Sequence, residues 1–137
     1  MMKNKIQINN INENDENLIK ELLDLMHVFK LDYTNTFVDI ENNNIQKYDF
    51  MKSWFAKLKE RRKLNNNKKV LKKSTNPKII PRNHIVEKIL NESEKDNFTT
   101  LDKLLVNLSN PYDNNISNEF KSQPKDEEKI HQTFCGT

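Results

Sequence analysis

Apolar residues recur at intervals of three and four along most of this sequence, and this spacing constrains the fold more than any other feature. It is the spacing of one helix face. The residues concerned are Leu18, Ile19, Leu22, Leu23, Met26 and Phe29; Tyr33, Phe37 and Ile40; Met51, Trp54, Phe55 and Leu58; Ile85, Val86, Ile89 and Leu90; and Leu101, Leu104, Leu105 and Leu108. We find no strand-like alternation and no internal repeat. The sequence predicts an all-α chain of about five helices.

Capping signals place the ends of these helices. Asp15 and Asp32 are expected to cap the first and second helices, since a carboxylate there accepts from exposed first-turn N–H groups. Pro81 suits the first turn of the fourth helix, and Asn110-Pro111 ends the fifth. Three regions follow: a disordered N-terminal segment over 1–14, a helical region over 15–112, and a flexible tail over 113–137 that ends Gln-Thr-Phe-Cys-Gly-Thr.

The 137 residues include one glycine, Gly136, and one cysteine, Cys135. Loops that cradle phosphate need glycine where the backbone approaches the ligand, so a Walker A, Rossmann or kinase glycine loop is excluded. One cysteine excludes an internal disulfide and a multi-cysteine zinc site. With no membrane-length apolar run and no secretory signal, we expect a soluble protein of the cytoplasm, or of mitochondria if the source is eukaryotic.

Positive charge is concentrated in one stretch. The formal net charge is +3, and Lys57–Lys73 holds nine Lys and Arg residues against one acid, Glu60. Such a stretch suits nucleic-acid phosphate or an acidic protein, and Trp54 with Phe55 beside it would suit base stacking. The alternative is a solvated basic helix face above core aromatics, which is the commoner outcome of this pattern. We therefore expect nucleic-acid binding to be weak at most.

Other chemistry-bearing residues are scattered. His27, His84 and His131 form no metal-binding motif, and three acids that could converge (Asp32, Asp39 and Glu41) lack a base or a metal signature. We assign no catalytic, cofactor-binding or metal-binding residue in this chain. Cys135 is the one redox candidate, because a thiol on an exposed tail can reach a partner's cysteine; an inert terminal thiol is the alternative.

Five short motifs occur in an order that is similar to one known family. They are Asp32-Tyr33-Thr34-Asn35-Thr36-Phe37; Asn76-Pro77; Pro81-Arg82-Asn83-His84; Phe98, Leu101, Leu104-Leu105 and Leu108 followed by Asn110-Pro111-Tyr112; and Gln132-Thr133-Phe134-Cys135-Gly136-Thr137. Together they resemble the C-terminal part of the selenoprotein O family, also called YdiU, from about residue 15 to residue 137.

The resemblance implies a kinase-like (pseudokinase) fold in which this region is a helical C-terminal extension. It implies membership of a protein adenylyltransferase family, whose members use ATP and Mg²⁺ to transfer AMP to Ser, Thr or Tyr hydroxyls of proteins. The catalytic lysine, glycine loop and metal-binding acids of such enzymes have no counterpart here. The resemblance also implies that Cys135 pairs with a cysteine near the activation loop and acts as a redox switch.

The resemblance therefore predicts a C-terminal fragment that holds no cofactor and is inactive alone. Its expected partner is the missing catalytic core, or a separately encoded N-terminal piece, and protein substrates would be reached only through that core. Two alternatives belong to other functional classes: a small basic helical module that binds nucleic acid, and a protein-interaction module that uses an uncovered apolar face.

Overall fold

The computed structural model describes residues 2–9, 12–65 and 74–128. Within these ranges the chain forms seven α-helices and no strand, and five of the helices have nine residues or more. The predicted all-α class and the predicted number of longer helices are confirmed. The chain divides into two compact units, Met1–Pro77 and Lys78–Thr137.

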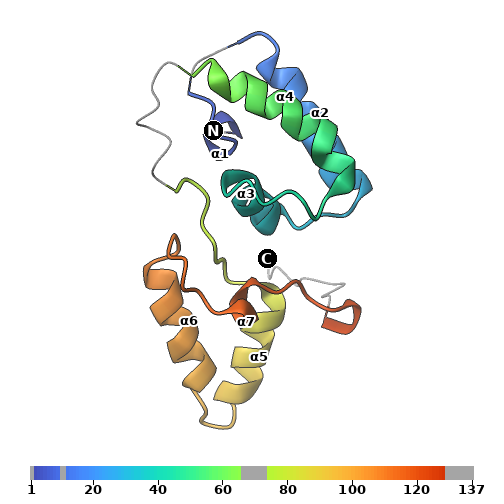
Figure 1. The fold of residues 1–137 in the computed structure, drawn as a ribbon. Helices are drawn as coiled ribbons and strands as arrows, with labels where there is room; N and C mark the ends of the chain where they lie inside the picture. The colour runs from blue at the N-terminus through green and yellow to red at the C-terminus, as the bar shows by residue number, and fades with distance from the viewer. Residues whose placement is uncertain (1, 10–11, 66–73, 129–137) are drawn as a thin grey trace, which may run out of the picture. The chain divides into compact units, whose positions relative to one another are not determined.

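The first unit is built around two helices that lie side by side, α2 (Asp15–Val28) and α4 (Lys52–Lys63) (Figure 1). The short α1 (Met2–Lys5) packs on α2. After α2 the chain forms α3 (Tyr33–Glu41), and a 3-10 turn, η1 (Asp49–Met51), then leads into α4. The buried core consists of Ile6, Ile8, Leu18, Leu22, Met26, Phe37, Ile40, Ile45, Met51, Trp54, Phe55 and Leu58.

Trp54 fixes the packing of α4 on α2. Its side chain is 1% exposed, and its indole Nε1 donates to the Leu18 carbonyl oxygen at 2.8 Å. A buried indole N–H needs such an acceptor. The aromatic stripe of α4 is therefore core, as the commoner interpretation of its spacing predicted.

The second unit is a helical hairpin of α5 (Asn83–Ser93) and α6 (Thr99–Ser109), followed by the short α7 (Asn118–Lys121) and a 3-10 turn, η3 (Asp126–Glu128) (Figure 1). α5 and α6 pack against each other. The core of this unit consists of Ile79, Ile85, Ile89, Leu104, Ile116 and Phe120.

The predicted helix ends are partly right. Asp32 caps α3, where its Oδ1 accepts from the Asn35 N–H at 2.8 Å, and α6 ends just before Asn110. The prediction for Asp15 was wrong: Asn14 precedes α2, and Asp15 is its first residue, with a side chain used elsewhere. The prediction for Pro81 was also wrong, because Arg82 is extended and α5 begins only at Asn83.

Long-range packing explains further differences from the sequence analysis. Ile6 and Ile8 belong to the segment expected to be disordered, yet both are buried in the first core. Ile116 and Phe120 belong to the expected tail, yet both are buried in the second core. The boundary predicted at residue 112 stays a prediction.

Some residues of the predicted stripes are not core. Leu23 and Phe29 on the first stripe, and Leu90 and Leu105 on the last two, are 40–55% exposed. Phe29 is stacked on Phe50, with ring centroids 3.6 Å apart, which leaves its other side open. The apolar face of each of these helices is therefore wider than the part of the helix that packs in the core of its unit.

Candidate functional site

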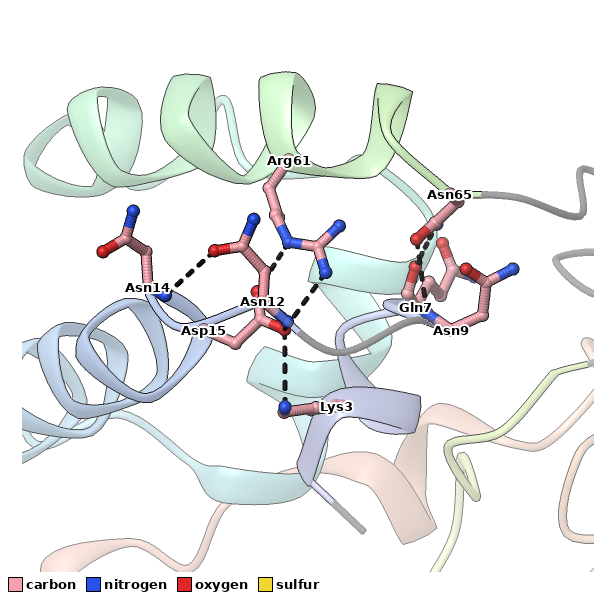
Figure 2. Close-up of polar contacts among 8 residues, drawn as sticks. All are labelled: Lys3, Gln7, Asn9, Asn12, Asn14, Asp15, Arg61 and Asn65. Atoms are coloured by element: carbon pink, nitrogen blue, oxygen red, sulfur yellow. Dashed lines mark hydrogen bonds and ion pairs between the residues drawn. The ribbon is translucent and has the colours of Figure 1, made fainter.

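A buried polar cluster lies between α2 and α4, around the carboxylate of Asp15 (Figure 2). Asp15 is 0% exposed and Arg61 is 8% exposed. The guanidinium donates from Nε to Oδ1 at 2.5 Å and from Nη2 to Oδ2 at 3.1 Å. This two-point contact matches the planar fork of arginine and joins the first residue of α2 to the last turn of α4.

Two further groups complete the surroundings of Asp15. The backbone N–H of Asn12 donates to Oδ2 at 3.1 Å, and the Lys3 ammonium lies 3.4 Å from the same oxygen. Burial alone raises the pKa of Asp15, but the hydrogen bonds from Arg61 and Asn12 and the charge of Arg61 outweigh it, so the pKa lies below its ordinary value. Asp15 is therefore held as a carboxylate whose lowered pKa and hydrogen bonds make it a poor general base near neutral pH.

The end of α4 also holds the N-terminal segment 4–9 in place (Figure 2). Asn65 donates from Nδ2 to the Gln7 carbonyl at 2.8 Å and accepts from the Asn9 N–H at 3.2 Å. Arg62 donates from Nε to the Ile6 carbonyl at 3.0 Å. Burial lowers the pKa of Arg62 to about 10, which still leaves it charged at neutral pH.

Residues 74–76 hold the same segment from another part of the chain. Asn76 is 1% exposed and donates from Nδ2 to the Lys5 carbonyl at 2.9 Å. Thr75 donates from Oγ1 to the Asn4 carbonyl at 3.1 Å. Sequence reasoning missed this arrangement, and the one signal for it was the pair of isoleucines, Ile6 and Ile8, in an otherwise polar stretch.

A pocket of about 270 Å³ opens beside the Asp15–Arg61 pair. Its lining residues are Asn14, Asp15, Asn17, Leu18, Glu21, Lys57 and Arg61. Lys57 donates to both carboxylate oxygens of Glu21, at 2.8 and 2.9 Å, so the charges around the pocket are paired with one another. Such pairing stabilises the fold and leaves no obvious charged group to bind or activate a ligand.

The acids considered from the sequence are not brought together as a site. Asp32 caps α3, while Asp39 accepts from the Tyr48 hydroxyl at 2.9 Å and pairs with Lys47 at 2.7 Å. Glu41 accepts from the Thr75 N–H at 2.8 Å. Across residues 2–9, 12–65 and 74–128, no group of three or more His, Cys, Asp or Glu side chains could hold a metal ion.

The two histidines that the structure describes form no site either. His27 is exposed on α2 and His84 is half-buried on α5, in the other unit. His131 and Cys135 lie outside the described residues, so the redox role of Cys135 stays a prediction.

The basic stretch is described as far as residue 65, and its cations there are largely engaged. Lys57 pairs with Glu21, Lys63 with Glu60 at 2.6 Å, and Arg61 and Arg62 bind the groups named above. Lys59 lies over the Phe55 ring, 4.9 Å from its centroid. Residues 66–73, the remainder of the basic stretch, lie outside the described ranges.

Among the described residues, no helix has the length and apolar character needed to cross a membrane.

No protein-family model matches this chain. Curated relatives do match. The chain is 38% identical over 146 residues to a protein of Clostridium perfringens, 40% over 147 residues to one of Clostridium botulinum, and 37% over 147 residues to one of Bacillus cereus. Each is named protein nucleotidyltransferase YdiU, and each match covers 99% of this chain but 30% of the relative. The chain is therefore homologous to part of the YdiU protein nucleotidyltransferases, and the resemblance read from its short motifs is confirmed.

Proposed function

We propose that this chain is the C-terminal helical region of a YdiU-type enzyme that transfers AMP from ATP to hydroxyl groups of proteins. In this role the chain contributes a packed helical body and no nucleotide-binding machinery, and it is inactive alone. The observation that carries the proposal is the match over 99% of this chain to 30% of each relative. The nucleotidyltransferase activity named for those relatives belongs to chains more than three times as long.

ATP and Mg²⁺ do not fit the residues described here. The cations in and beside the Asp15 cluster, Lys3, Arg61 and Lys57, are already paired with Asp15 or Glu21. The described acids form no metal-binding group, and the sole glycine of the sequence is Gly136. Phosphoryl chemistry of this kind needs positioned cations and metal-holding acids, so the proposal assigns ATP, Mg²⁺ and protein substrates to the remainder of the enzyme.

The nucleic-acid alternative has less support. Backbone-directed binding depends on cations that are free to replace counterions at phosphates. Between residues 57 and 65 most of the cations are engaged with Asp15, Glu21, Glu60 or main-chain carbonyls. The aromatics Trp54 and Phe55 are 1% and 7% exposed, so neither offers a ring face for base stacking.

The proposal is tested in a chimera in which this chain replaces the matched 146 residues of the Clostridium perfringens relative. We expect the chimera to transfer labelled AMP from ATP to protein, and the isolated chain to transfer none. The relative without the matched residues serves as the control and should lose activity. A folded chimera that transfers no AMP, or an isolated chain that does, contradicts the proposal.

A further inference from the structure

α5 and α6 carry the same pattern of residues at corresponding positions. Residues 85–90 read Ile-Val-Glu-Lys-Ile-Leu, and residues 100–105 read Thr-Leu-Asp-Lys-Leu-Leu. Ile89 and Leu104 correspond, and both are buried, at 6% and 5% exposure. Leu90 and Leu105 also correspond, and both are more than half exposed, at 54% and 55%. The two helices therefore share an apolar surface that the core of their unit does not use.

Helix geometry places these leucines on one face of the hairpin. Each follows a buried residue directly, so each projects about 100° away from the buried side of its helix. α5 and α6 are adjacent and run in opposite directions (Figure 1). α5 and α6 pack against each other, and Ile89 and Leu104 on their buried sides share one core. Because the pair is antiparallel, the same rotation from these two residues carries Leu90 and Leu105 to one side of the hairpin.

Three more apolar residues extend this surface. Val86 and Leu101 stand three positions before the buried Ile89 and Leu104. Each therefore lies about 60° around its helix axis from that buried residue, between the core and the exposed leucines. Phe98, at the start of α6, lies close to the direction of Leu105 and is 48% exposed. We call this surface the hairpin face: Val86, Leu90, Phe98, Leu101 and Leu105.

Acidic residues border the hairpin face on both helices. Glu87 and Asp102 each stand two positions before the buried residue of their helix. Each therefore lies about 160° around the helix axis from that residue, just beyond the exposed leucine. Both are exposed, as is Glu94 on the same side of α5. Lys88 and Lys103 lie about 260° around the helix axis from the same buried residues, and so outside the hairpin face. The surface is thus an apolar strip between acidic edges, which fits an apolar partner surface bordered by Lys or Arg.

We propose that the hairpin face docks onto the remainder of a YdiU-type polypeptide, which covers Leu90 and Leu105 and meets the acidic edges with basic residues. This inference rests on the proposed function. We assign the remainder of the polypeptide as the partner because the matched region is 30% of each relative, so most of such a polypeptide lies outside this chain. A contiguous exposed apolar surface of this kind marks an interface.

The test compares Leu105→Lys with Val106→Lys, its neighbour on α6. Val106 is 71% exposed and lies outside the hairpin face, so it is a matched control for an exposed apolar residue of the same helix. In the isolated chain, neither variant should change the thermal midpoint. In the chimera described above, Leu105→Lys should lower the thermal midpoint by several degrees, because it buries an unpaired ammonium, and Val106→Lys should not.

Each outcome decides between the proposals. A chimera that folds and in which both variants melt alike overturns the docking inference. A chimera in which the variants differ but AMP transfer is absent keeps the inference and overturns the proposed function. An isolated chain that is dimeric, and that Leu105→Lys makes monomeric, assigns the face to a second copy and also overturns the inference.

Co-expression provides the same comparison without the covalent junctions, should the chimera not fold. The 137-residue chain is produced with the remainder of the Clostridium perfringens relative, and the two are purified together. Recovery of the Leu105→Lys chain should be at least about tenfold below that of the Val106→Lys chain, as expected for a charge placed at an interface. Equal recovery of the two variants, or no recovery of the wild-type chain, overturns the inference.

Discussion

Arg61, in the last turn of α4, donates two hydrogen bonds to the carboxylate of Asp15, the first residue of α2. The pair joins residues 46 positions apart in the sequence and is almost fully removed from solvent. A buried charge without its partner is strongly unfavourable, so this contact makes the packing of α2 on α4 depend on both side chains.

Arg61→Ala should therefore lower the free energy of unfolding by about 3–5 kcal/mol, because it leaves the Asp15 carboxylate buried without its main partner. Lys57→Ala is the control: it breaks an exposed ion pair with Glu21 on the same two helices and should cost less than about 1 kcal/mol. Urea denaturation of the three proteins measures both changes. Similar losses in the two variants would contradict the structural role of the buried pair.

The lowered pKa of Asp15 predicts a dependence of stability on acid. Its pKa in the folded chain lies below the ordinary value of 3.8, so below about pH 4 the unfolded chain binds a proton that the folded chain does not. The contribution of Asp15 to the free energy of unfolding is complete above that pH and is lost as the pH falls through the pKa of Asp15 in the folded chain. Urea denaturation between pH 5 and pH 2 should show a shallower fall for Asp15→Asn than for the wild type; equal slopes would contradict the prediction.

Trp54→Ala should destabilise the chain by about 3–5 kcal/mol, the usual cost of truncating a buried aromatic side chain. Trp54→Phe keeps most of the apolar volume but loses the hydrogen bond to Leu18, so it should cost clearly less. Thermal and chemical denaturation measure both. A Trp54→Ala chain with an unchanged midpoint would show that the indole is exposed and would restore the base-stacking alternative.

Asn76→Ala should loosen the N-terminal segment, because the Lys5 carbonyl loses its buried donor. We expect faster amide hydrogen exchange in peptides that cover residues 2–9, measured by mass spectrometry. Asn107→Ala is the matched control, since the Asn107 amide donates to Lys103 within its own helix. Unchanged exchange of residues 2–9 in the Asn76 variant would mean that this contact does not hold the segment.

Local spacing predicted the helices well because it reports on helix faces directly. The stripe from Met51 to Leu58 was predicted fully: all four of its apolar residues are buried, and charged residues flank them. Spacing alone could not show how much of a face is covered. Leu90 and Leu105 fit their stripes as well as Ile89 and Leu104 do, and only the tertiary structure separates them.

Long-range polar contacts could not be predicted in the same way. A carboxylate before a helix is usually a cap, and nothing near Asp15 in the sequence indicates a partner as distant as Arg61. The burial of Ile6 and Ile8 likewise depends on donors from Arg62, Asn65 and Asn76, which come from two other parts of the chain. The similarity of residues 85–90 to 100–105 is visible in the sequence, but a match of six residues is too short to indicate a structural repeat.

Calorimetric titration with ATP and Mg²⁺ tests most directly the claim that this chain is a helical part of a nucleotidyltransferase without its nucleotide site. The isolated chain should give no binding heat, because its described cations beside the polar cluster are paired and its described acids form no metal-binding group. The chimera with the Clostridium perfringens relative should bind ATP in a Mg²⁺-dependent manner. Micromolar, Mg²⁺-dependent binding of ATP to the isolated chain would contradict the account.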